Sequence, residues 1–369
     1  MNTINPEFRG KLEKFGAVDI QACYNCGNCT AICPLSEKNN SFPRKMLRAS
    51  VLGLENKIEG SLDPWLCYYC GDCTETCPRE ANPGELMMSL RRYLTSVYDW
   101  TGLSKLFYTR KIWEIIFILL IAATVIGLFI VYFPKEQIAN FTTYIGNETF
   151  IYWVEIGDWI MAGLVGGLLI TNIFNMWYKT IIKNKIKVPF TAYFTEFYQL
   201  IVHFATQIRF RKCDASGKKY WVSHLLLMTG YSLMFAMIVV LLPWFQTDKV
   251  YEWYEPQRLL GYYATFGLLF GLTVVIIQRI SKSTTRTEYS HLSDWMFIIL
   301  LYLTTVTGIL VHIFRLYDMS AATFYIYVIH LAILVPMIII EVPFSKWSHL
   351  AYRPFSVYFS KLQEKSRKK

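Results

Sequence analysis

Several signals that would assign this 369-residue chain to a common class of enzyme or exported protein are missing from its sequence. No G-x-G-x-x-G loop is present, which argues against a nucleotide-binding unit in this chain. No period-2 pattern of the kind found in membrane barrels occurs. The residues from Met1 to Glu7 contain no apolar stretch, so we expect no export signal there. Histidine is scarce, since only six are present and none precedes His203.

Cysteine, by contrast, is present in a repeated arrangement. Eight of the nine cysteines fall in two copies of the motif C-x2-C-x2-C-x3-C-P, one ending at Pro34 and the other at Pro78. This spacing is typical of a pair of four-iron clusters, in which the last cysteine of each run binds the other cluster. We therefore predict one [4Fe-4S] cluster bound by Cys23, Cys26, Cys29 and Cys77, and a second bound by Cys67, Cys70, Cys73 and Cys33.

The residues around these cysteines fit iron–sulfur clusters better than zinc or disulfides. Gly27 and Gly71 let the backbone approach a cluster closely, and the proline after each run turns the chain away. Zinc sites use separated C-x2-C pairs, and disulfides require an oxidising compartment. The ninth cysteine, Cys213, lies in a basic loop and is interpreted as an ordinary free thiol.

The composition divides the chain into a polar part and a membrane part. Hydrophobic residues make up 54% of the chain and its mean hydropathy is +0.29, which is too apolar for a wholly soluble protein of this length. Six apolar segments are long enough to cross a bilayer as helices, namely 112–133, 151–178, 221–242, 259–280, 294–314 and 321–342. We therefore predict a mainly α fold, with an N-terminal α-helical dicluster ferredoxin domain (1–110), a six-helix transmembrane bundle (111–343) and a basic tail (344–369).

Basic residues indicate how these segments are oriented. The segments 179–220, 279–293 and 344–369 contain 19 lysines and arginines, whereas 134–150, 243–258 and 315–320 contain 4. Because basic loops stay in the cytoplasm, both termini and the cluster domain are predicted to be cytoplasmic, in a multi-pass protein of the inner membrane. This placement accounts for the net charge of +10 without a nucleic-acid partner. Residues 190–208, flanked by basic runs, are predicted to form an amphipathic helix on the inner surface.

Three of the histidines lie inside predicted spans and are candidate haem ligands. An imidazole in a membrane helix is costly and is usually functional, and paired histidines on facing helices hold b-type haem. Counted from the cytoplasmic edge, His224 is the shallowest, and it differs in depth from His330 by roughly 13 Å. Depth alone therefore favours pairing His330 with the deeper His312, and His224 with His203 or His349.

Together these motifs resemble a known family. Residues 1–110 are similar to the small iron–sulfur subunit of heterodisulfide reductases. The remainder is similar to their membrane cytochrome b subunit and to the gamma subunit of respiratory nitrate reductases, in the segments 221–230 and 343–349 and at His330. A fusion of the two parts resembles the QmoC family, the membrane subunits of the quinone-interacting oxidoreductase complexes of sulfur-metabolising bacteria.

The resemblance implies one or two haem b groups. It implies that His224 and His330 share the haem nearest the cluster domain. The second haem of nitrate reductase gamma subunits uses a histidine ten residues after the first. In this chain that position holds Met234, which by depth is a further partner for His330. His312 and His203 are therefore the next candidate ligands.

The resemblance also implies a function. It implies a subunit of a quinone-dependent oxidoreductase that transfers electrons between menaquinone and a cytoplasmic partner in dissimilatory sulfur metabolism. The implied partners are flavin-containing soluble subunits similar to HdrA (QmoA and QmoB) and, through them, adenylylsulfate reductase. The chain has no Cys-Cys-Gly sequence, so we expect no disulfide cleavage within it.

The sequence also fits two other functions and contains three carboxylates that are candidates for moving protons. The chain also fits the membrane subunit of a heterodisulfide reductase or of a DsrMK-like complex, and, in another class, a membrane-bound redox sensor. Glu155, Asp158 and Glu341 lie near span ends, where they are either proton relays for a quinone or plain interfacial carboxylates.

Overall fold

The computed structural model describes residues 4–36, 40–208, 217–247, 249 and 251–367. Within these residues the chain is helical and has no strand, and six of its helices are long and apolar enough to cross a membrane. The predicted mainly α fold with six membrane helices is therefore confirmed.

The N-terminal helices form a domain around one buried helix, α7 (Pro83–Tyr98). Proline at the first position of α7 starts the helix where no backbone N–H is needed, and nearly all residues of α7 are buried. Short helices surround it, and two of them, α2 and α6, carry cysteines of the two motifs. These helices are α1 (Phe8–Lys14), η1 (Ile20–Ala22), α2 (Asn28–Ile32), α3 (Arg44–Val51), α4 (Glu55–Glu59), α5 (Asp63–Leu66), α6 (Asp72–Glu75) and α8 (Leu103–Thr109).

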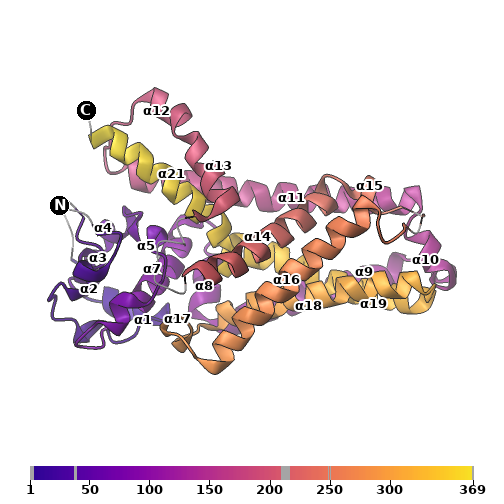
Figure 1. Cartoon of the computed structure of the whole chain (residues 1–369), viewed down its shortest axis with the longest axis horizontal. Coiled ribbons are helices and arrows are strands. Elements are labelled where there is room, and N and C mark those ends of the chain that lie inside the picture. The colour runs from indigo at the N-terminus through magenta and orange to yellow at the C-terminus, as the bar shows by residue number, and fades with distance from the viewer. Residues whose placement is uncertain (1–3, 37–39, 209–216, 248, 250, 368–369) are drawn as a thin grey trace.

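Six long helices extend from this domain as a bundle (Figure 1). They are α9 (Lys111–Tyr132), α11 (Glu148–Trp177) with its π-helical continuation η3 (Tyr178–Ile182), α14 (Gly217–Val239), α16 (Pro256–Ser281), α18 (Leu292–Leu316), and α19 (Ser320–Pro336) continued by the π-helical turn η5 (Met337–Glu341) and α20 (Val342–Phe344). At the far end the connections contain η2 (Lys135–Asn140), α10 (Phe141–Tyr144) and α15 (Leu242–Phe245). The cluster-domain end, where residues 1–110 lie, has α12 (Phe190–Thr195), α13 (Phe197–Thr206), α17 (Thr285–Glu288), η6 (Lys346–Ser348) and α21 (His349–Arg367).

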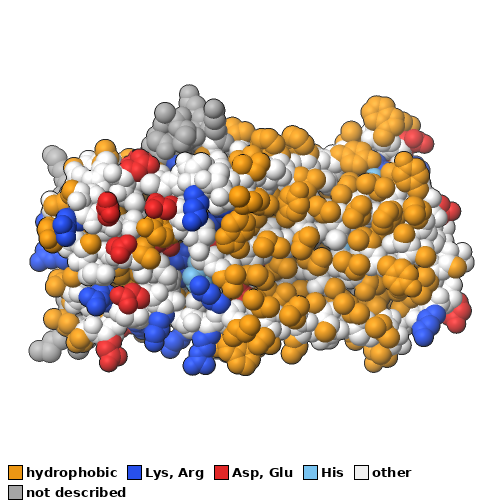
Figure 2. All heavy atoms as spheres, turned by 90° about the horizontal axis from the view of Figure 1, so that it is seen from below, with side chains coloured by type: hydrophobic (Ala, Val, Ile, Leu, Met, Phe, Trp, Pro, Cys, Tyr) orange, Lys and Arg blue, Asp and Glu red, His pale blue; other side chains and the backbone are white. Residues whose placement is uncertain are grey.

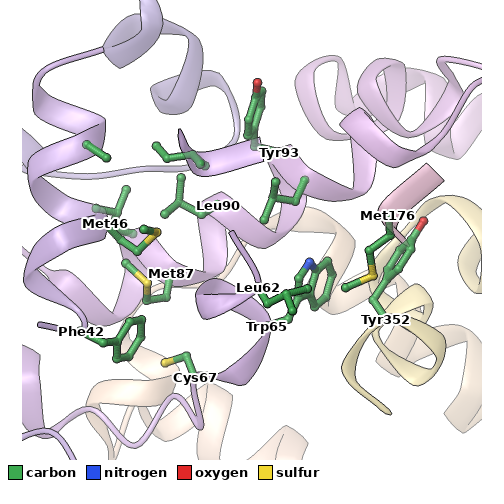
Figure 3. Packing of buried hydrophobic residues seen from close by; sticks show 14 of the residues in the cluster. Phe42, Met46, Leu62, Trp65, Cys67, Met87, Leu90, Tyr93, Met176 and Tyr352 are labelled. Carbon is green, nitrogen blue, oxygen red and sulfur yellow. The ribbon is translucent and has the colours of Figure 1, made fainter. Parts of the chain in front are cut away.

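The N-terminal domain and the bundle share one hydrophobic core. Trp65 of α5 packs against Tyr352 of α21 with ring centroids 5.0 Å apart, and Met176 of α11 is buried in the same cluster (Figure 3). Leu362 of α21 is also fully buried. Full burial of a leucine-sized side chain contributes about 1.5–3 kcal/mol. The segment expected to be a basic tail therefore includes a packed helix that joins the two parts.

The surface of the bundle is apolar along its length. Hydrophobic side chains cover the long helices, whereas charged side chains gather on the N-terminal domain and, in smaller number, at the opposite end (Figure 2). Residues 190–208 form two short helices, α12 and α13, which pack against α21 and are not among the six membrane helices. Phe190 and Phe194 are exposed, while Glu196 is buried and pairs with Lys365 at 3.2 Å. This segment therefore presents apolar side chains outward and polar ones toward the protein.

Candidate metal centres

The eight motif cysteines line two cavities in the N-terminal domain. One cavity is lined by Cys23, Cys26, Cys29 and Cys77, and the other by Cys33, Cys67, Cys70 and Cys73. Each set combines three cysteines of one motif with the last cysteine of the other, because α2 and α6 pack against each other. The structure thus brings together the two sets of four that the sequence predicts as cluster ligands. We call them the first and the second cysteine set.

The two motifs have the same backbone geometry. Gly27 and Gly71 have φ values of +95° and +99°, and each precedes the short helix that carries the third cysteine of its motif. The backbone N–H groups of Asn25 and Tyr69 donate to the Sγ atoms of Cys23 and Cys67 at 3.4 and 3.3 Å. Such N–H···S bonds stabilise a thiolate and tune the potential of a cluster. The loops are therefore shaped to hold a negatively charged group.

The spacing of the sulfur atoms fits a cluster better than a single ion. In the described part of the chain, no three Cys, His, Asp or Glu side chains are close enough to hold one metal ion. The cavity of the first cysteine set contains about 360 Å³ of empty space and that of the second about 390 Å³, and part of each is open to solvent. A zinc ion needs four sulfur atoms at about 2.3 Å, whereas a four-iron cluster binds each thiolate to a separate iron.

The protonation of the thiols couples metal binding to pH. Burial raises the pKa of the Cys33 thiol to about 11 and raises the pKa values of Cys67 and Cys73 as well. These thiols are therefore protonated at neutral pH when no metal is bound. Iron must displace their protons to bind, so we expect its affinity to fall as the pH is lowered.

The second cysteine set lies against the membrane part of the chain. Nε of Arg286, from the connection between α16 and α18, donates to the carbonyl oxygen of Cys70 at 3.1 Å. Nη2 of Arg353 in α21 donates to the carbonyl oxygen of Cys67 at 3.2 Å, and Arg91 of α7 donates to the same oxygen. Three guanidinium groups therefore surround this set and would offset the negative charge of a bound cluster.

The first cysteine set lies closer to solvent. Cys26 is exposed. The corresponding cysteine of the second motif, Cys70, is half-buried, and its carbonyl oxygen accepts from Arg286. The nearby arginines of the first set come from the N-terminal domain itself, and one of them, Arg44, donates from Nε to the side chain of Asn25 at 2.8 Å. The first set is therefore the accessible one of the two.

His224 lies near the second cysteine set, at the cluster-domain end of α14. The ring of Tyr220, one turn away, lies 6.0 Å from the His224 ring and 4.6 Å from the guanidinium carbon of Arg286, which contacts Cys70. Burial lowers the pKa of His349 to about 3, and the charge of His224 contributes to this lowering. His349 is therefore close enough to His224 for the two side chains to interact electrostatically.

Two histidines have one ring nitrogen fixed by an oxygen atom. Nδ1 of His349 donates to the carbonyl oxygen of Lys346 at 2.7 Å. Nδ1 of His330 lies 2.9 Å from the hydroxyl of Thr307, which itself donates to the carbonyl oxygen of Leu303 at 2.7 Å. Thr307 therefore accepts from His330. Metal-binding histidines use this arrangement, because it leaves Nε2 as the nitrogen that binds the metal.

The other two candidate histidines have different surroundings. Nε2 of His312 lies 2.6 Å from Nη1 of Arg258, and Tyr262 also contacts this nitrogen at 3.1 Å. A guanidinium group only donates, so the lone pair of Nε2 is engaged in this arrangement. His203 is buried on α13, a helix that packs against α21. Neither side chain is placed beside a second candidate ligand by these contacts.

The bundle histidines lie at three different depths. Gly271 of α16 packs against the turn of α14 that contains His224. His312 contacts Tyr262, which is nine residues from Gly271 and therefore roughly 14 Å further along α16. The contact with Thr307, five residues before His312 on α18, places His330 roughly 8 Å nearer the cluster domain than His312. His224 and His330 therefore differ in depth by roughly 6 Å.

Sequence reasoning missed a buried carboxyl group, Glu114, which lies beside Glu341. Both side chains have an exposed fraction of 0%. The sequence does contain a signal for Glu114, because it is an acidic residue at the start of the apolar segment 112–133, and charged groups in membrane helices are usually functional. Glu155 and Asp158 lie on α11 in the half of the bundle away from the N-terminal domain. Cys213 lies outside the described residues.

Comparisons with known proteins agree with the dicluster domain and with a membrane redox subunit. Residues 19–81 match the family described as 4Fe-4S dicluster domain. The E subunit of the dihydromethanophenazine:CoB–CoM heterodisulfide reductase of Methanosarcina thermophila is 28% identical over 165 residues, which covers 38% of this chain and 58% of that protein. A protein of Archaeoglobus profundus similar to the C subunit of heterodisulfide reductase is 35% identical over 88 residues, which covers 24% of this chain and 47% of that protein.

These matches are partial, and the chain spans about half the length of the curated relatives it matches. No solved structure matches the chain. The chain therefore contains a 4Fe-4S dicluster domain, has six membrane-type helices, and is similar in part to the C-like and E subunits of heterodisulfide reductases.

Proposed function

We propose that this chain is the membrane subunit of a quinone-dependent oxidoreductase complex, and that it transfers electrons between menaquinone and a soluble flavin-containing partner. The observation that carries this proposal is the position of the eight motif cysteines, which line two cavities at one end of a six-helix bundle. When bound there, iron–sulfur clusters and haem b would supply one-electron redox chemistry.

The cysteine sets would hold the two clusters. Cys23, Cys26, Cys29 and Cys77 would bind one, and Cys67, Cys70, Cys73 and Cys33 the other. The different surroundings of the two sets support an order along the molecule. The exposed first set would face the soluble partner, and the second set, with arginines from α21 and α17 against it, would face the membrane part. The 19 basic residues of the segments 179–220, 279–293 and 344–369 in the sequence support a cytoplasmic location for both sets.

His224 and His330 would bind haem b, and the contacts of His349 favour it as the partner of His224. His349 interacts electrostatically with His224 and has its Nδ1 fixed by the Lys346 carbonyl, which leaves Nε2 for iron. The resemblance pairs His224 with His330 instead, but these two differ in depth by roughly 6 Å. We therefore propose His224 with His349 near the second cysteine set, and His330 as a ligand at a deeper level.

The soluble partner is proposed to be an HdrA-like flavoprotein pair that leads to adenylylsulfate reductase. The name of the Methanosarcina relative supports a second candidate, because that protein belongs to a heterodisulfide reductase that uses dihydromethanophenazine. Purification of the complex from its natural membrane distinguishes the two. Flavoproteins that pass electrons to adenylylsulfate reductase support the first, and a subunit that cleaves a disulfide supports the second.

The direct test uses the full chain, purified anaerobically in lipid nanodiscs. We expect the iron content of two four-iron clusters plus haem, and rapid reduction of the haem absorbance and of the cluster EPR signals by a soluble menaquinol analogue. Cys29→Ser and Cys73→Ser should each remove one cluster signal, whereas Cys213→Ser, outside both motifs, should retain both. His224→Ala should stop reduction of the clusters by the quinol analogue but not by dithionite.

Three results would contradict the proposal. Zinc in place of iron would exclude clusters at the cysteine sets. Equal loss of signal in the Cys29 and Cys213 variants would exclude the ligand assignment. Failure of the quinol analogue to reduce a sample that is fully loaded with haem and clusters would favour a redox sensor over an electron-transfer subunit.

A further inference from the structure

Two buried carboxyl groups face each other at the cluster-domain end of the bundle. Glu114 lies in the first turn of α9 and Glu341 at the end of the π-helical turn η5, and both have an exposed fraction of 0%. Helix α9 packs against η5, and Ser345, four residues after Glu341, hydrogen-bonds to Glu114, so the two carboxyl groups are close enough to interact electrostatically. We call them the carboxyl pair.

The pair receives few hydrogen bonds from the rest of the protein. The hydroxyl of Ser345 donates to Oε1 of Glu114 at 2.6 Å. Within the described residues, no hydrogen bond reaches Oε2 of Glu114 or either oxygen of Glu341. The backbone N–H of Lys346 lies near Glu341, but its ammonium group pairs with Asp294 at 2.6 Å. No cation of the described chain therefore forms an ion pair with either carboxyl group.

The carboxyl pair would be unstable if both Glu114 and Glu341 carried a negative charge. An ionised carboxylate without a partner in an apolar environment is very costly, so it takes up a proton instead. Two carboxylates that share a site cannot both ionise, and one proton between them supplies a hydrogen bond to the second group. The geometry therefore requires at least one proton on the carboxyl pair.

The local backbone explains why Glu341 points inward. Pro336 interrupts the hydrogen bonding of α19, and the helix continues as a π-helical turn that ends at Glu341. Turns of this type are frequent at functional sites. Helix α9 packs along α19, which brings Glu114 to the same level.

A continuous line of ion pairs and hydrogen bonds connects this region to the second cysteine set, and its members Glu85, Arg92 and Asp294 are buried. Lys346 follows Ser345 directly, and its ammonium group pairs with Asp294 of α18, which pairs with Nη2 of Arg92 at 3.2 Å. Nη1 of Arg92 contacts Glu85 at 3.0 Å, and Glu85 accepts from the hydroxyl of Tyr69 at 2.9 Å. Tyr69 is part of the second cysteine motif. A charge at the second set is therefore linked to the region of the carboxyl pair through groups of which only Lys346 and Tyr69 are partly exposed.

Other titratable groups around the pair come from several elements. Tyr108 of α8 interacts with both carboxyl groups, and Asp294 of α18 acts on Glu114. Arg279 and Arg92 act on Asp294 and Lys346, and Arg92 also acts on Tyr108. Helix α20 and the inner half of α11, residues 159–177, contain no Asp, Glu, His, Lys or Arg. Low dielectric and few neighbours leave the pair sensitive to a charge added nearby.

We propose that Glu114 and Glu341 form a redox-linked proton site, which holds one proton between them at rest and takes up a second from water when an electron reaches the redox centres at this end of the bundle. This inference rests on the proposed electron-transfer function. In the coupled step one electron enters from the quinol, or from dithionite in an assay, and one proton forms an O–H bond on the ionised carboxyl group. The added negative charge on the metal centre is thereby balanced.

Infrared spectroscopy of the resting full chain in nanodiscs tests the shared proton without electron transfer. We expect a C=O band of a buried protonated carboxyl group that is lost in Glu341→Gln and shifted or lost in Glu114→Gln. Glu155→Gln, in the half of α11 away from the N-terminal domain and from the carboxyl pair, is the matched control and should leave the band unchanged. A band that persists in both Gln variants would refute the shared proton.

Redox titration at several pH values tests the coupling. The wild-type potential of the centre nearest the pair should shift with pH by up to a tenfold change in equilibrium per pH unit, about 59 mV for one electron. In Glu341→Gln this slope should decrease, while the Glu155→Gln control retains it. Equal slopes in all three proteins, each with full cluster and haem signals, would overturn the inference and leave the electron-transfer proposal intact. Absence of quinol oxidation together with an intact infrared band would refute the electron-transfer proposal and leave the proton shared at rest intact.

If a glutamine variant fails to fold, Glu341→Leu provides a second route, because an apolar side chain of similar size removes the buried polar group. Retention of the wild-type pH slope in a folded Glu341→Leu protein would also refute the coupling.

Discussion

Replacing Gly71 by alanine tests how closely the second cysteine loop is fitted to the membrane part of the chain. Gly71 has a φ of +99°, and a Cβ atom there would lie 2.2 Å from Oγ1 of Thr285. The left-handed backbone costs about 1–2 kcal/mol for a residue with a Cβ. Overpacking against Thr285 adds about 1–3 kcal/mol. We therefore expect Gly71→Ala to lower the free energy of unfolding by about 2–5 kcal/mol.

Two other glycines separate these contributions. Gly102 has a φ of +79° and no atom within 4 Å of its added Cβ, so Gly102→Ala reports the backbone cost alone. Gly27, at the equivalent position of the first motif, has a φ of +95°, and its Cβ would lie 3.3 Å from Nη1 of Arg44. The end of an arginine side chain can move, so Gly27→Ala should cost little more than Gly102→Ala. The predicted order of destabilisation is Gly71, then Gly27, then Gly102.

Chemical denaturation of the cluster-loaded chain, followed by visible absorbance, measures these differences. Thr285→Ala should restore part of the loss caused by Gly71→Ala, since it removes the hydroxyl but leaves a Cβ 3.0 Å from the added methyl group. Thr285→Ala alone loses a hydrogen bond to Glu75, worth about 0.5–1.5 kcal/mol. A double-mutant cycle isolates the steric coupling. If Gly71→Ala costs no more than Gly102→Ala, or if the cycle shows no coupling, the described contact is wrong.

Three further predictions concern buried polar groups. Arg92→Leu leaves the buried carboxylate of Glu85 without a cation and removes one of the two cations that pair with Asp294, so it should lower the free energy of unfolding by about 3–5 kcal/mol, whereas Arg9→Leu, at an exposed pair, should cost at most about 1 kcal/mol in the same denaturation assay. Burial lowers the pKa of His291 to about 4, so the unfolded chain binds a proton first as the pH falls below 6.5, and stability should decline by about 1.4 kcal/mol per pH unit down to about pH 4. His291→Asn keeps a side chain that can cap α18 and should remove this part of the slope in denaturation curves from pH 4 to 7. His224→Ala and His349→Ala should remove the same haem signal in optical and EPR spectra and His330→Ala a different one, and loss of the same signal in His224→Ala and His330→Ala would favour the pairing of His224 with His330.

The fold class could be predicted because its signals are local in the sequence. Membrane helices need about 20 apolar residues in one run, so six such runs identify six helices. The cysteine spacing is equally local, because three ligands on one tight loop must be close in sequence. Only the exchange of the fourth cysteine is a long-range feature, and it follows from a general property of two-cluster motifs.

The joint between the two parts could not be predicted in this way. Trp65 and Tyr352 pack together from opposite ends of the chain. A basic composition after residue 343 indicates membrane orientation, and it gives no sign that Tyr352 and Leu362 are buried. Their burial depends on how α21 folds back over the N-terminal domain, which is a property of the tertiary structure.

The contacts between the buried charged groups could not be predicted either, because they also depend on the tertiary structure. Arg92 and Asp294 are separated by 202 residues, and Ser345 and Glu114 by 231. Taken singly, each of these residues fits an interfacial position beside a membrane helix. Their meaning depends on their partners, which only the packing of α7 against α18 and of α9 against α19 brings into contact.

The charge balance of this region indicates which group can change its protonation. Glu85, Arg92, Asp294 and Lys346 form a line of two acidic and two basic groups that compensate each other. Buried ion pairs of this kind are seldom more stable than apolar contacts of similar volume, so stability alone gives little reason for them. The carboxyl pair has no such compensation from the described residues, and a proton is the compensation available to it. A negative charge added to the second cysteine set would therefore favour a proton on this pair, which no opposite charge of the described residues compensates.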